Sequence, residues 1–139
     1  MKIESLEIRE TETIQIKSSD DILKLTDDLK NKKQEHFVTI TLDGAHNVIQ
    51  RRIVFIGTLN KSIVHPREIF AGAISDRAAD IILVHNHPSG SLKPSPEDIN
   101  STERLVKAGE ILEIKILDHV IVSRKGYYSF LENGLINWI

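Results

Sequence analysis

One short segment, residues 80–85, restricts the fold of this chain more than any other. It has the sequence DIILVH, and the four residues between Asp80 and His85 are all apolar. Such a run is typical of a central strand whose two faces are both covered by other parts of the protein. The segments before and after it carry helical patterns. We therefore expect a β-sheet sandwiched between helices.

The rest of the chain alternates between strand and helix patterns. The segments 35–42 and 48–57 flank the turn DGAHN, which predicts an antiparallel hairpin. Pro66 and Pro96 stand at favourable first positions of two helices. Helices are expected at 18–33, 65–79 and 95–112, and further strands within 5–19, 114–123 and 127–131. This order predicts one α/β domain over residues 1–139, with a mixed sheet between helices.

Composition excludes several classes of site. The chain has 139 residues, enough to bury roughly two thirds of its unfolded surface. It contains no cysteine, so thiolate metal ligands and a cysteine nucleophile are excluded, and a tightly bound transition metal must use His, Asp or Glu. The net charge of −2 argues against a strongly electrostatic nucleic-acid binder. The N-terminus MKIESLEIRE lacks an apolar signal core, and no apolar run approaches membrane-spanning length, so we expect a cytoplasmic protein without a membrane span.

The stretch VHNHPSGSLKPSPED, residues 84–98, gathers groups that can bind a metal. His85 and His87 are two positions apart at the end of the expected central strand, so both side chains point to the same side. Ser95 begins the next helix, and Asp98 lies one turn into it, where its carboxylate can fold back toward the histidines. Two imidazoles and one carboxylate leave a fourth position for water, which is the pattern of catalytic zinc.

Each part of this stretch also has a simpler explanation. An H-x-H pair is common at strand ends, the segment HPSG forms turns, and S-x-x-D before an apolar helix is usually a capping box between Ser95 and Asp98. The cap and a metal site are compatible, because one carboxylate can serve both. The convergence of three ligand groups favours the metal site, in which zinc lowers the pKa of bound water to about 7.

The spacing of these residues matches a known family. H-x-H, seven intervening residues and then S-x-x-D resembles the JAMM signature of the JAB/MPN metalloprotease superfamily. The longer string HNHPSGSLKPSPEDI, with HPREIF before it and LDHVIV after it, resembles the RadC branch of that superfamily. The resemblance covers the chain from about residue 35 to residue 134.

The resemblance implies a fold, a cofactor and a set of roles. It implies an α/β/α sandwich of the cytidine-deaminase-like type, with one zinc ion per chain held by His85, His87 and Asp98. Ser95 would steady the bound water or the oxyanion. Glu35, which opens EHFVTITL, stands where JAMM proteins place the glutamate that takes a proton from water and passes it to the leaving amine. The alternative for Glu35 is a solvated charge at the end of a lysine-rich helix.

The remaining histidines and one aspartate have less specific predictions. Asp118 and His119 fit the pattern of the branch and are either hydrogen-bonding partners of the metal ligands or packing residues beside a strand. His36, His46 and His65 are predicted to be surface or turn residues.

Three functions follow as hypotheses. The first is a zinc hydrolase that cuts an amide bond in a peptide or isopeptide substrate. The second is a DNA-repair-associated or DNA-processing protein, although the helix-hairpin-helix module of longer RadC members is not expected here, so binding to nucleic acid should be weak. Its candidate contacts are Lys93, Arg104, Lys107, Arg124 and Lys125. The third is a non-catalytic interaction module, but such relatives usually lack the metal ligands. Neither the substrate nor the oligomeric state follows from the sequence.

Overall fold

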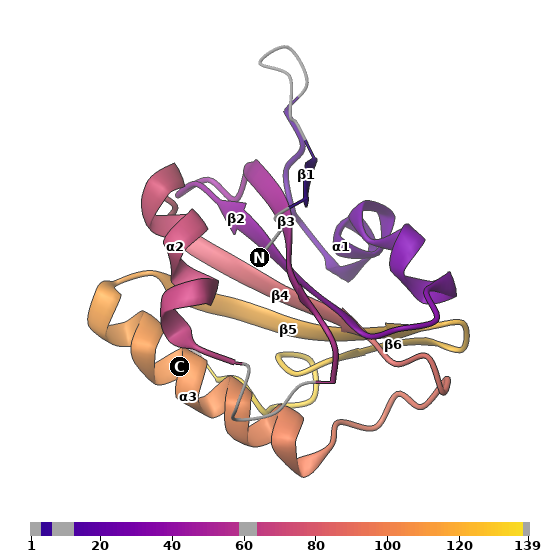
Figure 1. Ribbon diagram of the computed structural model, residues 1–139. Coiled ribbons are helices and arrows are strands. Elements are labelled where there is room, and N and C mark those ends of the chain that lie inside the picture. Colours follow the sequence, from indigo (N-terminus) through magenta and orange to yellow (C-terminus); the bar gives the residue numbers. More distant parts are fainter. Residues whose placement is uncertain (1–3, 7–12, 59–63, 138–139) are drawn as a thin grey trace.

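The computed structural model describes residues 4–6, 13–58 and 64–137 (Figure 1). The expected alternation of helices and strands is confirmed within these ranges; residues 7–12, part of the predicted N-terminal strand region, lie outside them. In chain order the elements are β1 (Glu4–Leu6), α1 (Ser19–Leu25), the 3₁₀ helix η1 (Asp27–Asn31), β2 (His36–Leu42), β3 (Val48–Ile56), α2 (Pro66–Asp76), β4 (Asp80–Asn86), α3 (Pro96–Leu112), β5 (Lys115–Ser123) and β6 (Gly126–Ser129).

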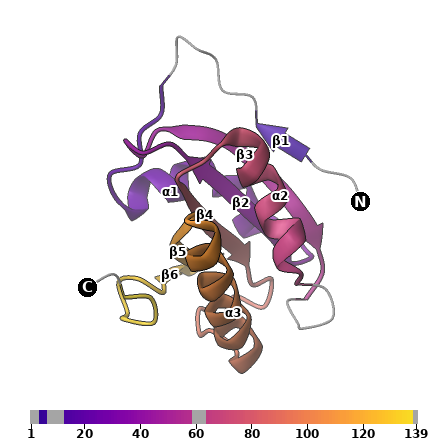
Figure 2. The same cartoon turned by 90° about the vertical axis from the view of Figure 1, so that its left-hand side faces the viewer.

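A mixed sheet forms the middle layer of the molecule. Within the described ranges its six strands have the order β1-β3-β2-β4-β5-β6. Strands β4 and β5 are parallel and are joined through α3, while all other neighbours are antiparallel. Helices α2 and α3 cover one face of the sheet and α1 covers the other (Figures 1 and 2). This is the predicted sandwich, because a parallel pair requires a crossover that lies on one face of the sheet.

Strand β4 separates two hydrophobic cores. All seven of its residues are buried. Ile81 and Leu83 pack with α2 and α3, whereas Ile82 and Val84 pack on the side of α1. The same alternation continues to His85, which therefore lies on the α2/α3 face and packs against the ring of Phe37. The all-apolar strand of the sequence is thus the centre of the sheet, and its last residues deliver the histidines.

The predicted single helix over 18–33 is wrong in its middle. Helix α1 ends at Leu25, and η1 follows as a separate 3₁₀ turn. Thr26 is buried at the junction, and its hydroxyl donates to the carbonyl of Ile22 at 2.8 Å. Thr and Asp side chains bond to nearby backbone and so compete with a continuous helix. The tighter turn still brings Leu29 fully into the core on the α1 side.

Two smaller predictions also need correction. His36 is buried rather than on the surface, because it is the first residue of β2, next to β4. The last strand ends at Ser129 instead of residue 131, because the backbone N–H of Leu131 donates to the carboxylate of Asp118 rather than to a strand. Among the described residues, no helix combines the length and the apolar character that crossing a membrane requires.

Candidate metal centre

The end of β4 and the start of α3 bring three ligand-competent side chains together. Ligand atoms of His85, His87 and Asp98 all lie within 4.8 Å of one another, so this group could hold a metal ion. The two histidine Nε2 atoms are 3.0 Å apart. Asp98 Oδ1 lies 3.4 Å from His85 Nε2, and Asp98 Oδ2 lies 3.3 Å from His87 Nε2. Tetrahedral ligands at ordinary zinc distances would be roughly 3.3 Å apart, so the group has the dimensions of such a site.

The start of α3 holds the aspartate in place. Ser95 is the N-cap, and its Oγ accepts the N–H of Asp98 at 3.0 Å. In return, Asp98 Oδ2 accepts the N–H of Ser95 at 2.8 Å. The capping box expected from S-x-x-D is therefore present, and it orients the carboxylate that faces the histidines. The cap and the metal-binding arrangement coexist in the same residue pair.

The carboxylate of Asp98 dominates the electrostatics of the group. Burial of Asp98 opposes its ionisation, but hydrogen bonds that the rings of His85 and His87 donate when they are protonated outweigh burial and hold the pKa of Asp98 well below the usual range. The same carboxylate raises the pKa of His87 through a hydrogen bond, against the opposing effect of burial, and the charge of Glu35 contributes in the same direction. The site therefore attracts positive charge, whether it is a proton or a metal cation.

His119 lies directly behind His85. Its Nε2 is 2.7 Å from His85 Nδ1, and its ring is fully buried and stacked on Phe130 with centroids 4.5 Å apart. Burial holds the pKa of His119 well below its ordinary value. Asp118 has a different role, since its carboxylate accepts from the hydroxyl of Ser129 and from backbone N–H groups. Of the two residues left open by the sequence, His119 contacts a candidate ligand and Asp118 fastens the turn after β6.

An irregularity in β5 determines that His119 faces the site. The register with β4 shifts between Ile81 and Ile82, so that Ile81 pairs with Ile116 but Ile82 pairs with Asp118. Ile116 belongs to the core under α2 and α3. Strict alternation from Ile116 would therefore have turned His119 toward α1. The extra residue, Leu117, forms a bulge that places His119 on the face of His85.

Asn86 lies between the two histidines, and the sequence analysis did not predict a role for it. Its Oδ1 accepts the N–H of His36 at 2.6 Å, and its Nδ2 donates to the carbonyl of Gln34 at 3.0 Å. These bonds hold the backbone on both sides of Glu35, whose own carbonyl accepts the N–H of Gly57 at 2.8 Å. Strand alternation could have indicated such a role. If His85 and His87 point toward the same site, the side chain of the residue between them must point to the opposite face.

A polar cleft opens beside the ligand group. It has a volume of about 470 Å³ and contains both Glu35 and Ser95 in its wall together with His87 and Asp98. The structure thus brings the proposed proton carrier and the N-cap serine to the same hollow as two of the three candidate ligands. The complete lining is Glu35, Thr58, His87, Ser89, Ser91, Lys93, Ser95, Glu97 and Asp98.

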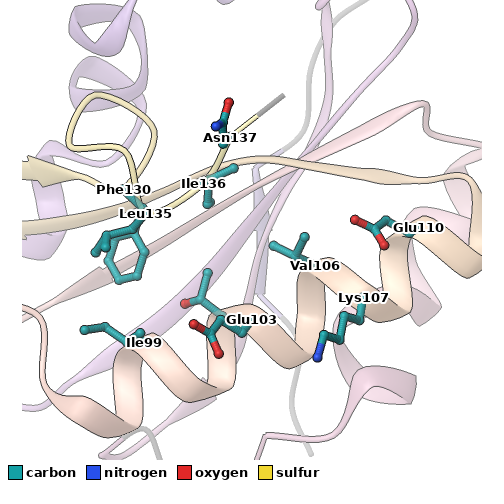
Figure 3. Close-up of a pocket in the computed structure, with 10 residues that line it drawn as sticks. Ile99, Glu103, Val106, Lys107, Glu110, Phe130, Leu135, Ile136 and Asn137 are labelled. Atoms are coloured by element: carbon teal, nitrogen blue, oxygen red, sulfur yellow. The ribbon is translucent and has the colours of Figure 1, made fainter. Parts of the chain in front are cut away.

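A second, more apolar groove runs along α3 (Figure 3). It has a volume of about 360 Å³ and lies between that helix and the segment that follows β6. Ile99, Val106, Phe130 and Leu135 form much of its wall, and none of the three candidate ligands lines it. The polar cleft, and not this groove, is therefore the one that contains candidate ligands in its wall.

A mixed α/β sandwich with a His-His-Asp group between a strand end and a capped helix defines a domain of the JAB class. The family model described as a RadC-like JAB domain matches residues 16–135, and the chain belongs to this family. The resemblance noted in the sequence is therefore confirmed.

Close relatives share most of this chain. A UPF0758 protein of Methanospirillum hungatei is 54% identical over 129 residues, which cover 91% of this chain and 57% of the relative. A UPF0758 protein of Trichlorobacter lovleyi is 50% identical over 78% of this chain and 47% of its own length. A third, from Shouchella clausii, is 46% identical over 91% of this chain and 56% of its own length. The chain spans about half the length of these relatives, and their shared name states no activity.

The basic residues considered for DNA contact lie on separate segments. Lys93 is in the polar cleft, Arg104 and Lys107 are on α3, and Arg124 and Lys125 form the turn between β5 and β6. A role in DNA handling stays a prediction.

Proposed function

We propose that this domain is a zinc-dependent hydrolase that cleaves the amide bond of a peptide or isopeptide. One zinc ion would be held by His85, His87 and Asp98. The observation that carries the proposal is the convergence of these three groups within 4.8 Å, two of which, His87 and Asp98, line a cleft that also contains Glu35 and Ser95. Two imidazoles and one carboxylate suit zinc better than magnesium or calcium, which prefer sites made of oxygen ligands.

The cleft contains the groups that amide hydrolysis needs. When bound, zinc supplies a Lewis acid that lowers the pKa of water and polarises a carbonyl. The carboxylate of Glu35 accepts a proton from the attacking water as the new C–O bond forms. It then delivers that proton to the nitrogen as the C–N bond breaks, so the products are a carboxylic acid and an amine. Ser95 keeps its own hydroxyl proton, because its Oγ accepts rather than donates in the cap, and this proton is available to the oxyanion.

Asn86 supports the assignment of Glu35. A proton carrier must stay within hydrogen-bonding reach of the reacting atoms, and a shift of about 1 Å can lower a rate by 10²-fold. The two bonds from the buried Asn86 side chain fix the backbone before and after Glu35. The residue that separates the histidines along the chain thus ties the Glu35 segment to the same strand.

Two substitutions distinguish the metal ligand from the proton carrier. Glu35→Gln keeps the size of the side chain but cannot take a proton, so zinc content and melting temperature should stay unchanged. Hydrolysis in a panel of peptide and isopeptide substrates should fall by about 10²- to 10⁴-fold. Asp98→Asn should instead lose zinc, because a neutral amide is a poor ligand. Elemental analysis of chelator-free protein, thermal melting and the substrate panel measure these outcomes.

Glu97→Gln is the matched control, because Glu97 is an exposed carboxylate in the wall of the same cleft. It should keep both zinc and activity. Loss of zinc from Glu35→Gln would make Glu35 a ligand, and full activity would place the proton carrier elsewhere. Wild-type protein with less than about a tenth of an equivalent of zinc, and no uptake on addition, would contradict the proposed function, which needs one site per chain.

A further inference from the structure

A chain of buried hydrogen bonds runs from the backbone of α3 to the candidate ligand His85. The hydroxyl of Thr102 donates to the carbonyl of Asp98 at 2.6 Å. Thr102 Oγ1 is also 2.6 Å from His119 Nδ1, and His119 Nε2 is 2.7 Å from His85 Nδ1. We propose that Thr102 and His119 are positioning residues that hold His85 in the one tautomer able to bind a metal. This inference rests on the proposed metal site and adds to it the device that prepares His85.

We call this series of bonds from the carbonyl of Asp98 through Thr102 and His119 to His85 the relay. Which atom donates in each of its bonds follows from the first bond, between Thr102 and the carbonyl of Asp98. A carbonyl can only accept, so the single hydroxyl hydrogen of Thr102 goes to the carbonyl of Asp98. The oxygen of Thr102 must then accept from His119, which places the hydrogen of a neutral His119 ring on Nδ1. His119 Nε2 is left as an acceptor, and it takes the hydrogen of His85 Nδ1. His85 Nε2 therefore keeps its lone pair, which faces the site.

The other histidine reaches the same state by a simpler route. His87 Nδ1 is 2.9 Å from the backbone carbonyl of Ser91, which can only accept. The hydrogen of a neutral His87 ring is thus on Nδ1, and its Nε2 also faces the ligand group. A backbone carbonyl determines the tautomer of His87, whereas the tautomer of His85 depends on the side chains of His119 and Thr102. If the hydroxyl of Thr102 donated to His119 instead, each tautomer in the relay would reverse, and His85 Nε2 would carry a hydrogen and could not bind a metal.

The relay also joins the elements that carry the ligands. His85 is on β4, His119 is on β5, and Thr102 is one turn after Asp98 on α3. Thr102 and Phe130, which both contact His119, form part of the wall of the apolar groove in Figure 3. The groove thus lies behind the relay, while the polar cleft lies in front of the ligand group.

The test uses the tautomer of His85 and the affinity for zinc, neither of which requires a substrate. In ¹⁵N-labelled, metal-free protein, imidazole ¹⁵N–¹H correlations at a pH where the rings are neutral should show His85 with its hydrogen on Nδ1. Thr102→Val removes the hydroxyl and keeps the shape of the side chain. It should convert His85 to a mixture of tautomers and weaken zinc binding by about 10- to 100-fold. Thr102→Ser should restore both properties.

Thr26→Val is the matched control, because Thr26 is equally buried and its hydroxyl makes the same bond to the carbonyl four residues earlier. It should lower the melting temperature without changing zinc affinity. Should Thr102→Val fail to fold, Thr102→Ala makes the same deletion with less bulk. The inference is overturned if wild-type His85 carries its hydrogen on Nε2, or if the folded Thr102 variant binds zinc as tightly as Thr26→Val. A protein that holds His85 in the Nδ1–H form, and loses zinc affinity with Thr102→Val, supports it even if no amide is cleaved.

Discussion

At the scale of single residues, the buried side chain of Asn86 links two parts of the backbone near the candidate site. The oxygen of its amide accepts the backbone N–H of His36, and the nitrogen donates to the backbone carbonyl of Gln34. Glu35 lies between those two residues, and its orientation depends on them. Removing such a buried amide leaves a backbone N–H and a backbone carbonyl without their partner, which costs about 1–3 kcal/mol for each buried group.

Substitution of Asn86 should therefore separate positioning from metal binding. Asn86→Ala is expected to keep zinc, because none of the ligand atoms is removed, while the Glu35 segment loosens. The amide of His36 should exchange with solvent faster, and hydrolysis should fall by about 10- to 100-fold. Amide exchange, zinc content and the substrate assay measure these effects. Asn100→Ala, an exposed change on α3, should alter none of them. An Asn86 variant that loses zinc would place the residue among the supports of the metal instead.

The sequence predicted some of these residues and not others for a physical reason. His85, His87 and Asp98 are close along the chain, and strand alternation followed by one helical turn is enough to bring them together. Thr102 was not predicted, and His119 was predicted only through the family resemblance, as either a partner of the ligands or a packing residue. Both join the site only in three dimensions, and His119 does so only because Leu117 forms a bulge. A bulge changes which residues face a core without leaving a distinct pattern in a single sequence.

At the scale of elements, the position where helix α3 ends determines how the chain enters strand β5. Helix α3 begins after the N-cap Ser95 and ends at Leu112, and its C-cap residue Glu113 has a φ of 58°, in the left-handed region. This ending turns the chain directly into β5, next to β4. The start of α3 was close to prediction because Ser95 and Pro96 mark it locally. The break at Thr26 was missed because Thr and Asp weaken a helix only slightly, and burial of Leu29 favours the tighter turn.

The end of α3 gives a prediction on stability. Glycine adopts the left-handed conformation of Glu113 without steric strain, which otherwise costs about 1–2 kcal/mol, although glycine also has more freedom in the unfolded chain. Glu113→Gly should therefore raise the free energy of unfolding by about 0.5–1 kcal/mol, as measured by denaturant titration. Glu110→Gly, an exposed change within the same helix, should lower it by about 1 kcal/mol. Equal effects of the two substitutions would show that the conformation at Glu113 is not strained.

At the scale of the whole molecule, a metal ion at the candidate centre would join β4 to α3. The ligands His85 and His87 come from the end of the central strand, and Asp98 comes from the helix that crosses to β5. Binding to the folded state alone stabilises it by about 2.7 kcal/mol at a free zinc concentration 100 times the Kd. For a domain of this size the melting temperature should rise by about 10 °C. His87→Ala should abolish this rise.

The effect of zinc should depend on pH in a direction set by His87. In the metal-free protein, hydrogen bonding to Asp98 raises the pKa of His87 above 6.5, so the protonated pair stabilises the fold below that pH and the contribution is lost as the pH rises through the folded pKa. Zinc requires the neutral ring, so protons compete with zinc as the pH falls through the same raised pKa. Asp98 stays ionised throughout, since its pKa is held far below its usual range. The zinc-dependent rise in melting temperature should therefore be largest near pH 8 and small near pH 5. A rise that is the same at both pH values would show that zinc binds away from His87.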